Sequence, residues 1–146
     1  MAYFTSVTGD IGIDKMGVCQ PHEHVYIVET PALTTNSLIR LCNLEASIRE
    51  LKLYREAGGQ TLVDANPLAT GRDALALRTA SRVSGVQIIA TTGYHIPSFY
   101  QKSHWIWTMD EEELTRLFTS ELVDGMYQGG HYEVPEHQTG IRAGLV

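Results

Sequence analysis

Two kinds of segment alternate along the chain, and each kind has its own spacing of apolar residues. Short apolar runs at residues 18–20, 61–65 and 86–91 have the length and composition of buried strands. The run at 86–91 is almost continuously apolar, as in a parallel strand covered on both faces. Residues 140–146 indicate the start of a further strand, so we expect four strands in one parallel sheet.

The segments between these runs carry apolar residues every three or four positions, which predicts helices with one buried side. They lie at residues 44–57, 71–84 and 110–124. Asn43 is placed to cap the first helix, and Gly58-Gly59 to end it. Asp110 stands three residues before Glu113, the spacing of a capping box at the start of the third helix.

The order of these elements predicts an α/β fold, because strands that alternate with helices form a parallel sheet with right-handed crossovers. A complete eight-unit barrel needs about 250 residues. We therefore expect residues 1–146 to be the N-terminal part of a single (β/α)8 TIM barrel, strands 1 to about 4, with the remainder outside this sequence. Residues 3–13 predict a short β-hairpin before the barrel, with its turn at Gly9-Asp10.

Composition and charge exclude several classes of protein. The chain is 43% hydrophobic and 19% charged, with a formal net charge of −6, and its 11 Lys and Arg residues are scattered. A nucleic-acid-binding surface needs clustered basic residues, so no nucleic-acid partner is expected. No apolar run is long enough to span a membrane, and residues 1–5 do not resemble a secretory signal, so we expect a cytoplasmic location. Cys19 and Cys42 form neither a disulfide framework nor a zinc-ribbon spacing and are interpreted as reduced core residues.

The pair His22 and His24 is the clearest chemical signal in the sequence. Residues two apart in a strand point to the same side, and the C-terminal ends of barrel strands carry the active site. Two imidazoles aimed at one point can bind a divalent metal, whereas Glu23 between them should point away and act in support. The spacing alone leaves open a coincidental pair of polar residues at a strand end.

Several blocks of the sequence together resemble the phosphotriesterase family of the amidohydrolase superfamily. They occur in the family's order across essentially the whole chain: Gly9-Asp10-Ile11, Met16-Gly17, His22-Glu23-His24-Val25, Leu62-Val63-Asp64, Gly71-Arg72-Asp73, Ser84 to Tyr94, and Ile141 to Val146. The resemblance implies a barrel with two divalent metal ions at its mouth, most often Zn, with Mn or Co as alternatives. It gives His22 and His24 as ligands of the more buried ion.

The remaining active-site groups that the resemblance implies lie beyond Val146, so no catalytic residue is assigned in this sequence. They are a carboxylated lysine or a glutamate that bridges the two metals, two further histidines and an aspartate. In this family a hydroxide that bridges the metals attacks the substrate, and neutral histidines are required as ligands. The resemblance also implies a homodimer.

The segment after the third strand supplies the candidate substrate pocket. The residues after Gly93 line the pocket in the resembling family, which indicates Tyr94 and His95, although His95 is not expected to bind metal. The aromatic residues at 97–107 either form a pocket wall or pack beneath a surface loop. Asp64 is interpreted as a structural hydrogen-bonding residue, and Arg72 and Asp73 as an ion pair that holds a loop.

Taken together, the residues and the resemblance predict a binuclear metal-dependent hydrolase of a small-molecule ester. Lactones or related carboxylic esters are preferred as substrates over phosphoesters. Two alternatives stay open: a non-catalytic relative that keeps the barrel but lacks the later ligands, and a small α/β binding protein without metal.

Overall fold

The computed structural model describes residues 2–30, 33 and 37–146. The chain begins with an antiparallel hairpin of β1 (Tyr3–Ser6) and β2 (Gly9–Gly12), followed by a 3-10 turn, η1 (Ile13–Lys15). The hairpin is confirmed, but its turn lies at Val7 and Thr8 rather than at Gly9-Asp10. The Ser6 side chain explains this position, because its Oγ accepts a hydrogen bond from the Thr8 N–H at 3.1 Å and donates to the Gly9 carbonyl at 3.1 Å.

Three parallel strands form the sheet in the order β3 (Val18–Glu23), β4 (Gly59–Asp64) and β5 (Gln87–Ala90). Beyond β5, the amide N–H of Thr92 donates to the Leu145 carbonyl at 2.8 Å, and that of Gly144 donates to the Ala90 carbonyl at 2.9 Å. The predicted fourth strand is therefore in its expected place beside β5. It makes one isolated parallel bridge instead of a ladder.

Helices follow the strands in the order that the sequence predicts, although the second begins at Ala74 and not at residue 71. They are α2 (Leu44–Glu56), α3 (Ala74–Ser84) and α4 (Glu111–Val123). Asn43 and Asp73 cap α2 and α3 by accepting hydrogen bonds from the amides of Ala46 and Ala76, and Asp110 forms a capping box with Glu113. Short 3-10 turns, η2 (Ser37–Ile39), η3 (Pro97–Phe99) and η4 (Trp105–Thr108), lie in the connecting segments. The sequence of residues 29–43 has no clear periodicity and predicts a loop, in which residues 31–32 and 34–36 lie outside the described residues.

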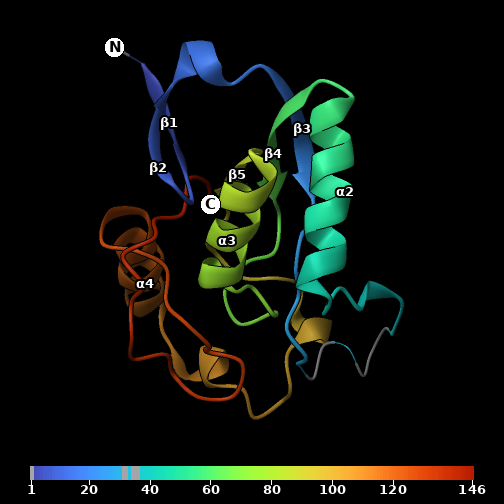
Figure 1. The fold of residues 1–146 in the computed structure, drawn as a ribbon. Helices are drawn as coiled ribbons and strands as arrows, with labels where there is room; N and C mark the ends of the chain where they lie inside the picture. Colours follow the sequence, from blue (N-terminus) through green and yellow to red (C-terminus); the bar gives the residue numbers. More distant parts are fainter. Residues whose placement is uncertain (1, 31–32, 34–36) are drawn as a thin grey trace.

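The main core lies between the sheet and its helices. α2 and α3 lie beside one another and cover one face of the strands (Figure 1). Leu62 of β4 and Ile88 of β5 point into this layer and are 2% and 0% exposed, and Leu77 of α3 meets them. This helix-on-parallel-sheet layer holds the C-terminal ends of the three strands at one edge of the sheet.

The exposure of the two cysteines and the length of the helices test two further expectations from the sequence. Cys19 and Cys42 are free thiols, but both are half-buried, so their interpretation as core residues is wrong. Among the described residues, no helix combines the length and the apolar character that crossing a membrane would require.

Candidate metal and substrate site

The two histidines lie where β3 ends, close to one another. Their ring centroids are 5.5 Å apart and the ring planes are nearly perpendicular, at 84°. His22 is exposed, whereas His24, just past the strand, is half-buried. Two imidazoles on one zinc ion would each place the ring centre about 3 Å from the ion, given Zn–N bonds of about 2.1 Å. The observed separation is compatible with this arrangement.

A register irregularity of the β-bulge kind lies at the two histidines, where plain strand alternation was assumed from the sequence. β3 advances from Gln20 to Glu23 while β4 advances only from Leu62 to Asp64, so β3 contains one extra residue. The irregularity includes Pro21, which has no amide hydrogen to donate to the ladder. Bulges of this kind redirect side chains and are common beside active sites.

His24 has the properties of a neutral imidazole with a lone pair available. Its Nδ1 is buried and has no hydrogen-bond partner among the described residues. Burial is the main cause that lowers the pKa of His24 below its ordinary value of 6.5, and the neighbouring His22 lowers it further, against an opposing effect of Glu23. Neutral histidine is the form that binds metal ions, so this residue fits the predicted ligand.

Glu23 and Asp64 support the backbone around His24. Glu23 Oε1 accepts a hydrogen bond from the His24 N–H at 3.0 Å. Asp64 is completely buried, and its two carboxylate oxygens accept from the amides of Val25 at 2.8 Å and Asn66 at 3.1 Å. The geometry agrees with the structural interpretation of both acids. Burial raises the pKa of Asp64 to about 7, although the two amide donors act in the opposite direction.

Tyr94 and His95 follow β5, and the His95 ring has a defined hydrogen-bonding state. His95 Nδ1 accepts a hydrogen bond from the Ile96 N–H at 2.9 Å. The centroid of the His95 ring lies 4.0 Å from the centroid of the Phe99 ring. Since the Nδ1 lone pair is engaged, the neutral ring carries its proton on Nε2 and can donate. This geometry favours a hydrogen-bond donor over a metal ligand. Tyr94 is 59% exposed, and its ring lies 5.9 Å from Phe118.

Most of the aromatic segment after His95 packs inside the protein. Tyr100, Trp105 and Ile106 are buried in a second apolar cluster with Leu68 and Leu117. Trp105 also donates from Nε1 to the Gly130 carbonyl at 2.8 Å, which anchors the segment to the following glycine-rich loop. These rings therefore pack beneath the loop; Trp107, at 46% exposure, is the ring of this segment that reaches the surface most.

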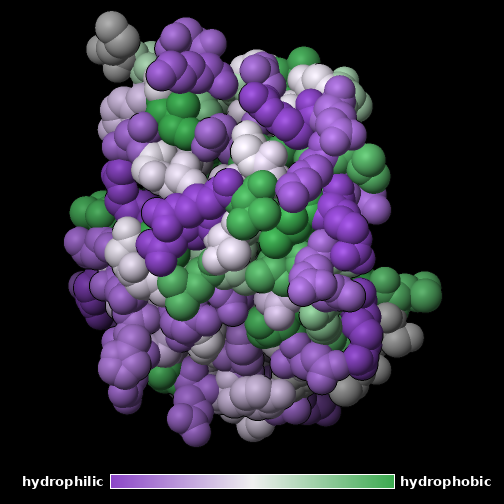
Figure 2. All heavy atoms as spheres, in the orientation of Figure 1, coloured by the Kyte–Doolittle hydropathy of each residue, from purple (hydrophilic) through white to green (hydrophobic). Residues whose placement is uncertain are grey.

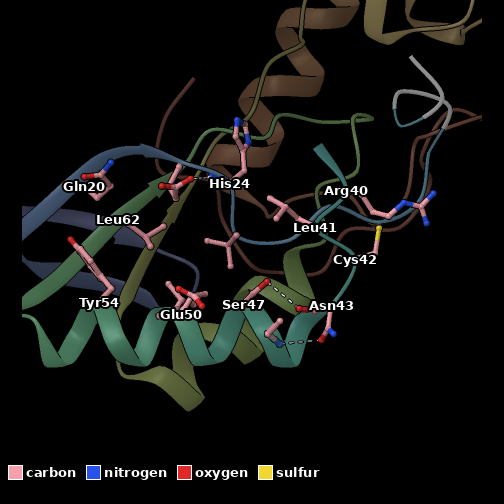
Figure 3. A pocket seen from close by; sticks show the side chains of 14 residues that line it. Gln20, His24, Arg40, Leu41, Cys42, Asn43, Ser47, Glu50, Tyr54 and Leu62 are labelled. Carbon is pink, nitrogen blue, oxygen red and sulfur yellow. Dashed lines mark hydrogen bonds between the residues drawn. The ribbon is translucent and has the colours of Figure 1, made fainter. Parts of the chain in front are cut away.

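A cavity of about 740 Å³ lies on the helix side of the sheet, and His24 is among the residues at its wall. Its walls include Leu51 of α2 and Leu62 of β4, both of which belong to the layer between helices and sheet. The His24 ring points away from α2 (Figure 3), and Tyr94 and His95 are not among the lining residues. Because barrel substrates bind at strand ends, we do not assign this cavity to the substrate.

The sequence did not predict a buried ion pair that lies near the strand ends. Arg72, expected to pair with Asp73, instead makes two hydrogen bonds to Glu121 of α4, at 2.8 and 2.5 Å. Its Nη1 also donates to the Thr91 carbonyl at 2.9 Å, and both charged side chains are at most 1% exposed. Glu121 follows Leu117 by four residues on the buried side of α4. An acidic residue on the apolar side of a predicted helix is the sequence signal that could have indicated a buried ion pair.

His22 and His24 need further ligands to complete a metal site. Across residues 2–30, 33 and 37–146, no group of three or more His, Cys, Asp or Glu side chains is arranged to hold a metal ion. The structure thus brings two predicted ligands together and places His95 near enough to affect the His24 pKa.

Comparisons with known proteins identify the family and agree with the fold. A sequence profile of the phosphotriesterase family matches residues 2–146. A phospho-furanose lactonase of Mycoplasmopsis synoviae (strain 53) is 30% identical over 145 residues, covering 97% of this chain and 41% of the relative. An N-acetyltaurine hydrolase of Danio rerio is 30% identical over 117 residues, covering 80% of this chain and 33% of the relative.

A crystal structure of an amidohydrolase from Mycoplasma synoviae superposes with a TM-score of 0.86 at 27% identity, over 98% of this chain and 42% of that chain. The chain thus spans about two fifths of the length of the proteins that it matches, and the predicted barrel-type α/β fold with an N-terminal hairpin is confirmed. The match over nearly all of its residues shows that the chain belongs to the phosphotriesterase family.

Proposed function

We propose that this chain contributes the first metal ligands of a hydrolase that cleaves small-molecule esters. One observation carries the proposal: the rings of His22 and His24 lie 5.5 Å apart at the end of β3. The relatives support it, because they are named as hydrolases or lactonases. The sequence covers about two fifths of those relatives, so the activity is proposed for the whole protein.

The residues present fit a divalent metal, in most cases zinc. His22 and His24 would hold it, and the unpartnered buried Nδ1 of His24 is the observation that supports this assignment. When bound, two such ions would polarise an oxygen atom of the substrate and lower the pKa of a metal-bound water molecule. The further ligands would come from residues outside this sequence.

The chain's own residues then have separate tasks. Glu23 and Asp64 hold the backbone on both sides of His24 through amide hydrogen bonds, which keeps the imidazole oriented. His95 would donate from Nε2 to an oxygen of the substrate, because its Nδ1 is already occupied by the Ile96 amide. Tyr94, being exposed, would line the entrance beside it.

We propose lactones or related carboxylic esters as the substrate class, with phosphoesters as the second choice. The support is the relative named as a phospho-furanose lactonase, which matches 97% of this chain. Free thiols at Cys19 and Cys42 suit the reducing cytoplasm, where we place the protein. We also propose that it works as a homodimer, which light scattering of the purified protein would test.

The hydrolase proposal is tested on the full-length protein with lactone, phosphotriester and N-acyl substrates, before and after removal of divalent metal by a chelator. We expect lactone hydrolysis that chelation abolishes and that added zinc or manganese restores. His24→Ala should lose this activity, whereas His137→Ala, which replaces an exposed histidine that is not a proposed ligand, should keep it. Lactone turnover that survives chelation, or that His24→Ala leaves intact, would contradict the proposal.

A further inference from the structure

A second concave site lies at the opposite end of the sheet from His22 and His24. The turn of the β1–β2 hairpin docks at the start of β5. There the Val7 N–H donates to the Ile88 carbonyl at 2.8 Å, and Thr8 Oγ1 donates to Gln87 Oε1 at 3.2 Å. Because β3 and β5 run parallel, this N-terminal end of β5 is remote from the strand end that carries the histidines.

Three arginine residues lie around a cavity at this place. A cavity of about 130 Å³ is lined by Arg78 and Arg82 of α3, by Arg142, and by the hairpin turn; we call it the arginine pocket. Its volume equals that of about four water molecules at ~30 Å³ each, which is room for one phosphate-sized group. Figure 2 shows strongly hydrophilic surface between the hairpin and α3.

The arginine pocket carries positive charge without enough negative charge to balance it. Arg142 is paired with Asp10, with 2.5 Å between Nη2 and Oδ1. Arg78 and Arg82 form neither an ion pair nor a side-chain hydrogen bond within the described part of the chain. They lie four residues apart on the same side of α3 and therefore repel one another. In a protein of net charge −6, two neighbouring cations without partners point to an anionic ligand.

The backbone beside the arginines is open and has unused donors. The amide N–H groups of Gly140 and Arg142, which both line the pocket, have no hydrogen-bond partner within the described residues. A Cβ built on Gly9 or on Gly140 would meet nothing within 4 Å, so an anion could approach both glycines closely. The hydroxyls of Ser6 and Thr8 are engaged in the turn, which leaves guanidinium and amide groups as donors.

We propose that the arginine pocket binds a phosphate group, either on a phosphorylated small molecule or as free inorganic phosphate. Guanidinium groups bind phosphate through paired, charge-assisted hydrogen bonds, and backbone amides in an open loop add further donors. No residue of this pocket belongs to the proposed hydrolytic site. The inference therefore stands or falls separately from the proposed function.

Binding is measured by isothermal titration on the full-length protein after divalent metal has been removed by a chelator, so that phosphate cannot bind at a metal centre. The probes are inorganic phosphate and ribose 5-phosphate, with chloride as the control for general charge screening. We expect saturable phosphate binding, weakened about tenfold or more by Arg78→Gln and by Arg82→Gln. Tighter binding of the sugar phosphate would indicate a phosphorylated metabolite, and equal binding would indicate free phosphate.

Two control variants separate a specific site from general charge. Arg49→Gln removes an exposed arginine from another helix and should leave binding unchanged. Asp10→Asn removes the acid that pairs with Arg142 and should tighten binding. Absence of saturable binding at millimolar phosphate would overturn the inference, as would equal losses in the Arg49→Gln and Arg82→Gln proteins.

Discussion

The carboxylate of Asp64 accepts a hydrogen bond from the amide N–H of Val25, with 2.8 Å between Oδ2 and the nitrogen. This bond joins the end of β4 to the residue directly after His24. The other carboxylate oxygen accepts from Asn66, so one buried acid fixes two loops that leave neighbouring strands. The orientation of His24 thus depends on a residue 40 positions away in the sequence.

Replacing Asp64 with alanine should weaken both the fold and metal binding. Two buried amides would lose their acceptor, at a cost of about 1–3 kcal/mol each in the free energy of unfolding. Loss of this support should also lower metal affinity by about tenfold or more. Urea denaturation and a metal titration measure the two effects, with the exposed Asp14→Ala as control. A folded Asp64→Ala protein with unchanged metal affinity would contradict the positioning role.

The same acid makes stability depend on pH in a defined direction. Burial raises the Asp64 pKa from 3.8 to about 7 in the folded chain, so between these values the folded state binds the extra proton. The contribution of Asp64 to the free energy of unfolding should therefore fall as pH rises from about 4 to about 7. Comparing metal-free wild type with Asp64→Ala at pH 5 and pH 8 isolates this contribution. If the stability of the wild type relative to Asp64→Ala increased from pH 5 to pH 8, the predicted pH dependence would be contradicted.

The buried pair of Arg72 and Glu121 should be far more sensitive than an exposed pair of the same chemistry. Glu121→Gln leaves an uncompensated guanidinium that is 1% exposed, and we expect a loss of about 3–5 kcal/mol in the free energy of unfolding. Glu112→Gln breaks the exposed pair with Arg116 on α4 and should cost about 0.5 kcal/mol or less. Thermal or urea unfolding compares the two variants directly, and equal losses would refute the assigned importance of the buried pair.

Local sequence signals predicted the regular elements well, because each signal acts over a few residues. Asn43, Asp73 and Asp110 all cap helices, and the first and third were identified from spacing alone. The hairpin turn was misplaced since Gly9-Asp10 is a strong turn signal, whereas the Ser6 hydroxyl that fixes the observed turn is a weak one.

Features that depend on distant residues could not be read from the sequence. The bulge at Pro21 is defined by the register against β4, and the partner of Arg72 lies 49 residues away. The proximity of His22 and His24 was expected from the strand-end position and from the family resemblance. The register irregularity at these residues and the hydrogen bond from Val25 to Asp64 are visible only in the packed structure.

Docking of the hairpin on the segment beside β5 should depend on the absence of a side chain at Gly144. A Cβ there would meet the Thr5 carbonyl oxygen at 2.3 Å and Ile89 Cγ2 at 2.8 Å. Gly144→Ala should therefore cost about 1–3 kcal/mol in the free energy of unfolding. Gly12→Ala is the matched control, because its Cβ would meet only the side chain of Asp14, which can rotate away. Similar unfolding midpoints for the two variants would argue against close docking of the hairpin.

The most direct test of the central claim is the amount of metal bound per chain in the full-length protein, measured by mass spectrometry of zinc, manganese and cobalt. If His22 and His24 are ligands of one ion, His22→Ala and His24→Ala should each lose at least one equivalent, while His137→Ala should match the wild type. Full metal occupancy in both of the first two variants would contradict the assignment of these histidines.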